Sequence, residues 1–399
     1  MIPSFIQVHT LRSFSAALIN RDDVGLAKRM PLGGCDRGRI SSQCLKRSLR
    51  THDGPDGLIS LKVPDTIRSR ELFERLIVAP LVDEGFALDA ARRVVGALRD
   101  IALGKAPDPK DGKKSKTVKK DDEIPPVHTD QVVVLGRPEV DHLLTLAREA
   151  IGVGGDARAA VDAVVGKDGL KNLNELVLGG GLSAALFGRM TTSDALARCD
   201  SAIHVAHAIT THAIESEPDH FSAIDDLTLA AGGLGSGHIG VTELTSGVFY
   251  GYVVVDVAQL AMNLTGCSRD RWRQEIGGSV AGAVLDRLVS MLCTVSPGAK
   301  RGSTAPYSYA QLALVEAGDL QPRTLGGAFL RPVRAQKDLD LLQGSIRALA
   351  SELSAQDRAY GGRVERRVLS VVDDVDAFGV RVSLPALRSW VSSLVGGGT

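Results

Sequence analysis

Residues 33–50 read GGCDRGRISSQCLKRSLR, and this stretch decides how the first part of the chain folds. Its two leading glycines predict a tight turn, and the residues after them predict a short strand. The serine pair that follows predicts the N-terminus of a helix. Leu45 and Leu49 would face a core, so the basic residues of this helix would remain on its outer side.

The wider basic block, residues 21–50, concentrates positive charge. It holds eight Lys and Arg residues against three acids, in a protein whose formal net charge is zero. The basic residues are Arg21, Lys28, Arg29, Arg37, Arg39, Lys46, Arg47 and Arg50. Because several of them stand beside a glycine turn and a helix N-terminus, where backbone N–H groups also face anions, a phosphate chain is the expected ligand. A solvated face without a ligand is the alternative.

Bulk composition bounds the class of protein. With 399 residues, 44% of them hydrophobic and 24% charged, the chain suits one large domain with insertions or two to three ordinary domains. Its five cysteines are scattered without a Cys-x-x-Cys pair, which favours reduced thiols and a cytoplasmic location. No stretch resembles a signal peptide or approaches the roughly 18 apolar residues of a membrane span, so we expect no membrane contact.

Strand and helix patterns interleave without a repeating βαβ period, which predicts an α+β fold with large insertions. Strands are expected at 5–11, 132–135, 184–192, 202–214, 248–257, 307–315 and 366–372. Helices are expected from the serine pair at 41–42 and at 69–103, 138–178, 269–293, 334–358 and 384–395. Residues 104–127 hold seven lysines and four prolines, a composition that predicts a mobile loop.

Enzymatic and metal sites find little support in the sequence. The three histidines between 204 and 212 lack the spacing of a tetrahedral zinc set, so we expect them to be structural. Residues 232–237 are glycine-rich but lack the Lys-Ser/Thr ending of a phosphate loop, and they predict a hairpin tip. Asp22 and Asp23 lie within the basic block and are expected to orient arginines. We therefore expect no catalytic residue, no metal and no cofactor.

The middle of the chain has the opposite charge. No Lys or Arg occurs between Cys199 and Ser268, and the same stretch holds eight acids. They are Asp200, Glu215, Glu217, Asp219, Asp225, Asp226, Glu243 and Asp256. Such a segment cannot hold phosphates by charge, so any role on nucleic acid would be steric and apolar. A basic patch and an acidic patch in one chain also suit a head-to-tail interface between copies, with ordinary solubility as the alternative.

Eight short islands carry a resemblance to a known family. They are residues 20–23, 33–50, 188–190, 207–212, 223–227, 238–240, 246–250 and 297–300. In this order they resemble the CasC family, the backbone subunit of the type I-E CRISPR complex Cascade. The resemblance implies an RRM-like (ferredoxin-like) antiparallel palm with a helical fingers insertion and a long thumb hairpin. The palm would comprise residues 1–65, 183–200 and 246–399, the fingers 66–182 and the thumb 201–245.

The same resemblance implies a non-catalytic subunit that binds guide RNA (crRNA) and stacks head to tail with copies of itself. Beside the other Cascade subunits, it would present the guide for pairing with target DNA. Contacts to guide phosphates would fall on Arg21, Lys28, Ser41, Gln43, Lys46, Arg47 and Arg50, and the charge of the block adds Arg37 and Arg39. An apolar wedge that interrupts base stacking would be formed by Met190 and Ile239.

An RRM-like CRISPR RNA-processing endoribonuclease is the alternative function. It would need a His or Tyr beside the basic block. His9, on the first expected strand, is the nearby candidate, although a histidine in that position more often serves the core or a strand face.

Overall fold

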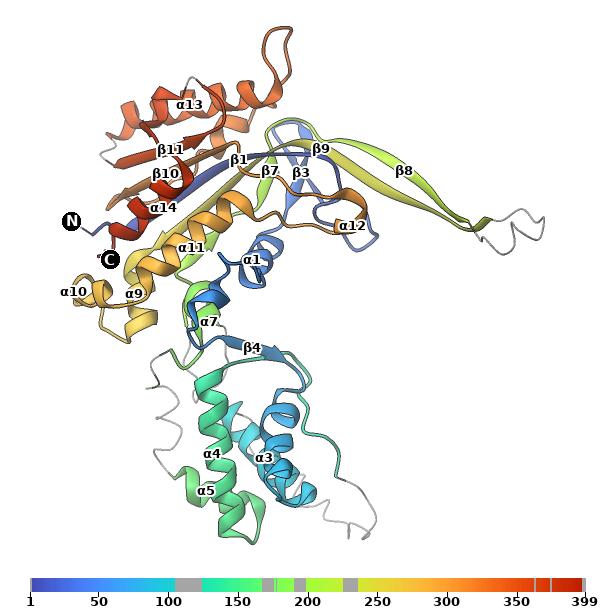
Figure 1. The fold of residues 1–399 in the computed structure, drawn as a ribbon, viewed down its shortest axis with the longest axis vertical. Coiled ribbons are helices and arrows are strands. Elements are labelled where there is room, and N and C mark those ends of the chain that lie inside the picture. Colours follow the sequence, from blue (N-terminus) through green and yellow to red (C-terminus); the bar gives the residue numbers. More distant parts are fainter. Residues whose placement is uncertain are drawn as a thin grey trace. The chain divides into compact units, whose positions relative to one another are not determined.

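The computed structural model describes residues 2–104, 124–166, 176, 178–189, 199–224, 236–361, 364–373 and 375–396. Met190, most of the expected mobile loop and most of the expected hairpin tip lie outside these residues. The chain divides into two compact units, which are described one at a time (Figure 1). Unit 1 comprises Met1–Leu61, Ile203–Val257 and Val280–Thr399, and unit 2 comprises Lys62–Ala202 and Ala258–Ser279.

Unit 1 is built on a sheet that has ten strands among the described residues. The order along its main path is β12 (Val380–Arg381), β11 (Glu365–Ser370), β10 (Leu312–Gly318), β1 (Phe5–Ala17), β9 (Ser236–Asp256), β7 (Ala208–Thr210), β3 (Cys35–Ile40) and β2 (Arg29–Leu32). β6 (Ile203–Val205) and β8 (Glu215–Ile224) also pair with β9. Within this sheet β11 and β12 pair in parallel, whereas the neighbours of β1 are antiparallel. The expected mixed α+β class is confirmed.

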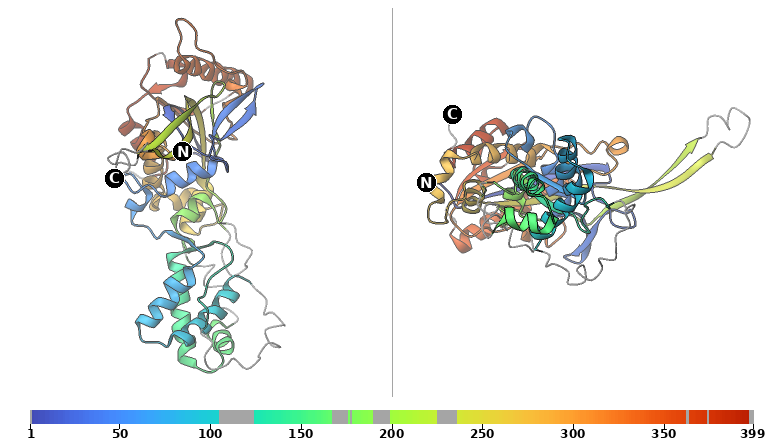
Figure 2. Two further views of the ribbon diagram at one scale, coloured as in Figure 1. Left: turned by 90° about the vertical axis from the view of Figure 1, so that its right-hand side faces the viewer. Right: turned by 90° about the horizontal axis from the view of Figure 1, so that it is seen from below.

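β9 is the longest of these strands and belongs to two substructures. Its first part pairs with β8, from Glu215 opposite Ser246 outward along a long hairpin. Its second part pairs with β1 in the middle of the sheet, from Gly247 onward. The strand expected at 248–257 is therefore confirmed in position, but it begins far earlier. We call β8 together with residues 236–246 the arm; it projects from the sheet in Figure 2.

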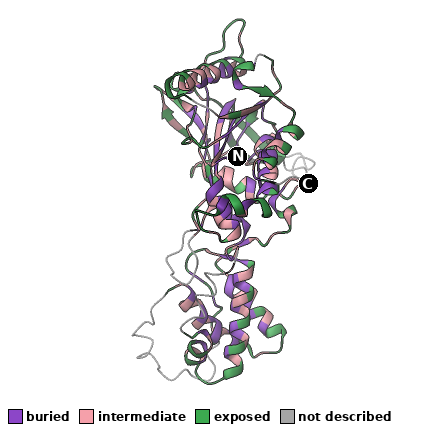
Figure 3. Ribbon diagram, turned by 90° about the vertical axis from the view of Figure 1, so that its left-hand side faces the viewer, coloured by how far each residue is buried: buried purple, intermediate pink, exposed green. Residues whose placement is uncertain are grey.

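Helices cover both faces of the sheet of unit 1. α13 (Leu341–Tyr360) lies on one face, where Leu11, Tyr250 and Leu349 share a buried core. The other face carries α1 (Ser42–Arg50), α11 (Ala281–Thr294) and α14 (Leu384–Ser393). Because helices cover both faces, β1 and the second part of β9 are largely buried on both sides, as the purple strands in Figure 3 show. The shorter elements of this unit are η1 (Leu58–Leu61), α12 (Arg301–Thr304), η4 (Gly326–Phe329) and η5 (Asp376–Phe378).

Unit 2 is mainly helical. It contains η2 (Glu74–Val78), α2 (Ala79–Asp83), α3 (Leu88–Ala102), α4 (Arg137–Val153), α5 (Ala157–Val165), α7 (Leu182–Phe187), most of α9 (Val257–Thr265), α10 (Trp272–Glu275) and η3 (Ile276–Gly278). A two-stranded sheet is formed by β4 (Thr66–Ser69) and β5 (Val133–Gly136). The core of unit 2 includes Phe73, Leu98 and Leu143, all fully or almost fully buried.

Several boundaries differ from those expected. The strand expected at 184–192 is wrong in its described part, because Leu182–Phe187 forms α7. Gly181 and Gly188 at its ends have positive φ angles, which let the chain turn sharply into and out of this short apolar helix. The helix expected at 138–178 is interrupted at Gly154–Gly155, both also with positive φ. Within the described ranges, no single helix is both long and apolar enough to cross a membrane.

Candidate nucleic-acid interface

The turn between β2 and β3 sets the position of the basic block. Gly33 and Gly34 have φ angles of 65° and 82°, so both occupy the left-handed region that a two-residue type I′ hairpin requires. A Cβ on Gly33 would lie 1.7 Å from the Leu330 carbonyl oxygen, so a larger residue cannot be accommodated there without moving the backbone. The expected glycine turn and short strand are confirmed.

Arg37, on β3, points into the protein and is 0% exposed. Its guanidinium donates hydrogen bonds to the carbonyl oxygens of Thr210 at 3.0 Å, Phe329 at 2.8 Å and Leu32 at 3.3 Å. Each of its three guanidinium nitrogens therefore donates to a backbone carbonyl inside the protein. Arg37 is a brace between segments, and the expectation that it contacts RNA is corrected accordingly.

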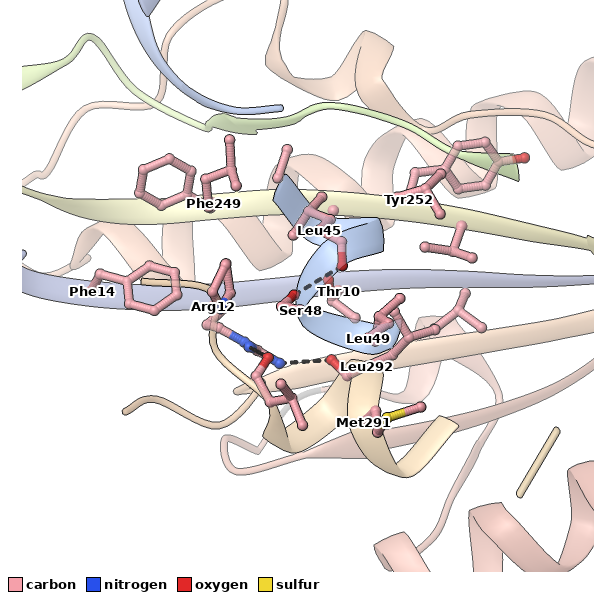
Figure 4. Close-up of a pocket in the computed structure, with 18 residues that line it drawn as sticks. Thr10, Arg12, Phe14, Leu45, Ser48, Leu49, Phe249, Tyr252, Met291 and Leu292 are labelled. Atoms are coloured by element: carbon pink, nitrogen blue, oxygen red, sulfur yellow. Dashed lines mark hydrogen bonds between the residues drawn. The ribbon is translucent and has the colours of Figure 1, made fainter. Parts of the chain in front are cut away.

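α1 presents its basic residues because its apolar residues are held by the sheet. Ser41 caps the helix, since its Oγ accepts a hydrogen bond from the Cys44 N–H at 3.3 Å. Leu45 and Leu49 point toward Phe249 on β9 and Met291 on α11, around a small and mostly apolar cavity of about 60 Å³ (Figure 4). The expected Ser-capped helix is thus confirmed, and its outer side carries the basic residues.

Two nearby loop segments and one distant segment converge at the N-terminus of α1. The Arg39 N–H donates to the Lys28 carbonyl at 2.8 Å, and the Ser41 N–H donates to Asn20 Oδ1 at 2.8 Å. His207, just before β7, accepts a hydrogen bond from the Ser42 N–H at its Nδ1 at 3.2 Å. The Arg39 guanidinium lies 3.5 Å from the same imidazole nitrogen. These contacts bring Lys28, Arg39 and the start of α1 to one place.

The ionisation of nearby groups reflects this concentration of charge. Partial burial lowers the pKa of His207, and the positive charges of Arg39 and Lys28 lower it further. Burial raises the pKa of the Cys44 thiol, while Lys28 and Arg47 act in the opposite direction. Lys28 is therefore close enough to influence groups beside both β7 and α1. Partial burial also lowers the pKa of Lys46.

The basic residues differ in whether an acid neutralises them. Arg29 forms an ion pair with Glu243 of the arm, and its charge is thereby occupied. In the described part of the chain, no ion pair joins a carboxylate to five other members of the block, which we call the basic surface. The basic surface consists of Arg21, Lys28, Arg39, Lys46 and Arg47. Arg50 is half-buried and Gln43 is exposed on the same helix.

Two further residues of the block serve the local backbone. The Asp22 carboxylate accepts hydrogen bonds from the N–H groups of Val24 at 3.0 Å and Leu26 at 2.9 Å. The expectation that this acid orients an arginine is wrong for Asp22, because a loop N–H pair occupies it. The Ser41 hydroxyl already accepts from Cys44, so its remaining capacity toward a phosphate is as a donor.

Of the other expected histidines, His204 on β6 is exposed, whereas His9 and His212 are internal. His9 is 0% exposed and lies between the Tyr250 hydroxyl at 2.9 Å and the Glu316 carboxylate at 3.2 Å. His212 is buried, donates from Nδ1 to the Ala213 carbonyl and accepts the Val248 N–H at Nε2. Both are structural. His207 is the imidazole at the basic surface, and sequence reasoning missed it because the pairing of Ile40 with Ala208 has no local sequence signal.

The arm exposes both apolar and acidic side chains. Ile239 is 70% exposed and lies on the same side of β9 as Val241, which is 58% exposed. Ile239 is therefore not buried within a core of the arm. Glu215, Glu217 and Asp219 on β8 are exposed as well, and no ion pair involves them in the described ranges.

Two chains of solved CRISPR complexes share this fold over nearly its whole length. One matching chain, from a structure described as "CRISPR RNA-guided surveillance complex, pre-nicking", is 25% identical, covers 98% of this chain and 100% of its own, and has a TM-score of 0.77. A second, described as "CRISPR RNA-guided surveillance complex", has 22% identity, 98% and 99% coverage and a TM-score of 0.65, and it supports the fold alone. No curated protein sequence matches.

The family assignment follows from the sequence match. A family model described as CT1975-like protein matches residues 6–390. The chain therefore belongs to the CT1975-like protein family.

Proposed function

We propose that this protein is the guide-RNA-binding backbone subunit of a type I-E CRISPR Cascade complex. The observation that carries the proposal is the basic surface, whose five cations have no carboxylate partner in the described residues: Lys28 and Arg39 lie at the N-terminus of α1, Lys46 and Arg47 follow along the helix, and Arg21 belongs to the preceding loop. Phosphate contacts of this kind fix a strand in place without reading its sequence. The family membership and the 25%-identical chain of a CRISPR RNA-guided complex support the same function.

In this proposal the protein polymerises head to tail along the crRNA and presents it for pairing with target DNA. The RRM-like palm would comprise residues 1–65, 183–200 and 246–399, the fingers 66–182 and the thumb 201–245, which includes most of the arm. Met190 and Ile239 would interrupt base stacking, and the exposure of Ile239 is what such a wedge requires. The subunit itself would cut neither strand.

The salt dependence of RNA binding tests the basic surface. Each phosphate neutralised on a single strand contributes about −0.7 to the slope of log K against log salt. Lys46→Ala/Arg47→Ala should therefore flatten the slope by about 1.4 for unrelated RNA sequences alike. Arg381→Ala is a matched control, because this exposed arginine is paired with Asp373. If the double variant keeps the wild-type slope, the basic surface is not part of the RNA-binding site.

His207 keeps the endoribonuclease alternative testable. That function needs an imidazole or a phenol at the basic surface; buried His9 does not meet this requirement, whereas exposed His207 does. Incubation of the purified protein with repeat RNA separates the two functions. RNA that is bound and left intact supports the backbone subunit. Cleavage that disappears in His207→Ala would establish the endoribonuclease instead.

A further inference from the structure

Two tyrosines close together in the chain are almost fully exposed on unit 1. Tyr307 is 72% exposed and Tyr309 is 71% exposed, in the segment that leads from α12 to β10. The residues on either side of Tyr309, Ser308 and Ala310, are half-buried and buried. Exposure therefore alternates along the segment, and the two phenol rings are presented on its outer side. The basic surface does not include them.

The segment is held in place from its inner side. The Ser308 N–H donates to Ser296 Oγ at 3.0 Å, and the Ser296 hydroxyl donates to the Ser308 carbonyl at 2.9 Å. Arg12, which is buried, lies 3.5 Å from Ser296 Oγ and is fixed by the carbonyls of Leu292 and Val295 (Figure 4). The Ala310 N–H donates to the Cys293 carbonyl at 2.7 Å. The two tyrosines are thus carried by an anchored backbone.

Their alternation along the backbone would leave room for one flat ring between them. Residues two apart in an extended segment are separated by about 6.6 Å, twice the rise per residue. Stacked nucleobases follow one another at about 3.4 Å, so a single base fits between two side chains at this separation. No ring contact joins Tyr307 to Tyr309 among the described residues, and the faces of both phenols are accessible.

The neighbouring charge favours an anionic occupant. Lys300 and exposed Arg301 directly precede this segment. Lys300 lines a groove together with Arg21 of the basic surface and Glu243 of the arm, whose carboxylate is already paired with Arg29. The Ala299 N–H donates to the Leu18 carbonyl at 3.2 Å, which ties the segment to the end of β1 just before Arg21. Exposed aromatic rings combined with cations are the means by which proteins bind single-stranded nucleic acid.

We propose that Tyr307 and Tyr309 form a stacking site for one unpaired base of the RNA that the basic surface holds. This inference rests on the proposed RNA binding and adds to it a contact to a base. Stacking is tolerant of sequence because every base has a π-face. The site would therefore fix the position of a nucleotide without selecting which one it is.

The test compares Tyr307→Leu/Tyr309→Leu with Tyr307→Phe/Tyr309→Phe in the full chain, with a single-stranded oligoribonucleotide as ligand. The Leu variant should bind about 5- to 150-fold more weakly, the effect of losing one stacked base. Its salt slope should equal that of wild type, because no charge has changed. The Phe variant keeps both rings and should bind as wild type does. Oligonucleotides with 5-iodouridine should photo-crosslink to Tyr307 or Tyr309 in wild type.

The outcomes separate this inference from the function beneath it. If the Leu variant binds as tightly as wild type, and crosslinks map elsewhere, the stacking site is wrong while RNA binding stands. If the Leu variant loses self-association in sedimentation without RNA but keeps its RNA affinity, the tyrosines contact a second copy of the chain. Absence of RNA binding by wild type would overturn both proposals. Circular dichroism establishes that each variant is folded.

Discussion

Arg29 of the basic block and Glu243 of the arm form an ion pair within one chain. Glu243 also accepts a hydrogen bond from the buried Ala27 N–H at 2.6 Å. Although partial burial acts to raise the pKa of Glu243, these hydrogen bonds outweigh it and hold the pKa below its ordinary value. The base of the arm is therefore tied to its own basic block.

The Ala27 hydrogen bond should matter more to stability than the ion pair. Glu243→Ala leaves a buried N–H without an acceptor and should cost about 1–3 kcal/mol in the free energy of unfolding. Arg29→Ala, which removes a partly exposed charge, should cost about 0–1 kcal/mol. Denaturant unfolding measures both. Equal losses would mean that the ion pair, and not the backbone contact, holds the arm.

Arg37→Met should destabilise the protein without altering its affinity for RNA. The change leaves three carbonyl oxygens without their donor and should cost at least about 2 kcal/mol. Below its unfolding temperature the variant should retain the wild-type salt slope, because Arg37 faces the interior. Arg47→Ala provides the opposite pattern: unchanged stability and a flatter slope. A reduced slope in folded Arg37→Met would return this residue to the interface.

The exposed acids of β8 should be needed for assembly. Reversal of Glu215, Glu217 and Asp219 to Lys should leave a folded monomer that no longer forms oligomers along RNA, because the arm would then repel the basic surface of the next copy. Sedimentation velocity with and without RNA reads this directly. Oligomers of wild-type size would exclude the proposed docking of the arm.

Ile239 should act on base pairing and not on folding. Ile239→Asp should leave the protein folded and bound to guide, because the side chain is exposed, yet abolish the periodic reactivity of bases in a guide–target hybrid under chemical probing. Insertion of an apolar side chain costs a few kcal/mol of unstacking, which a carboxylate cannot recover. Val241→Asp is the matched control from the same side of the arm. Identical patterns in the two variants would remove Ile239 as the wedge.

Acid should destabilise unit 1 through His9. Burial lowers the pKa of His9, so the unfolded chain binds the proton more readily and stability falls as pH drops below about 6.5. Although burial acts to raise the pKa of Glu316, its hydrogen bond with His9 and the charges of Arg366 and Arg323 lower that pKa to about 2. The stability that ionised Glu316 contributes is therefore lost only as the pH falls from about 4.5 to 2. Between pH 7 and 5, His9→Gln should therefore show a flatter dependence of unfolding free energy than wild type. If His9→Gln shows the same pH dependence of unfolding free energy as wild type, His9 is not its source.

Local sequence patterns predicted the secondary structure of the basic block, but they did not predict which distant residues contact it. The glycine turn, the short strand and the Ser-capped helix follow from neighbouring residues, and all three are found in the structure. Arg37 could not be placed from sequence, because the Phe329 carbonyl that it contacts comes from a segment 292 residues away. The position of His207 depends likewise on the pairing of β3 with β7. The buried helix at Leu182–Phe187 was misread because short apolar runs suit strands and helices alike.

The continuity of β9 has a mechanical consequence. At Ser246 and Gly247 the strand passes from the arm into the sheet without a break in its backbone, and the His212 ring lies where a Cβ on Gly247 would be. A pull on the arm is therefore delivered along covalent bonds to the pairing of β9 with β1, where many hydrogen bonds share the load. A force applied at the far end of the arm would therefore be transmitted to the middle of the sheet of unit 1.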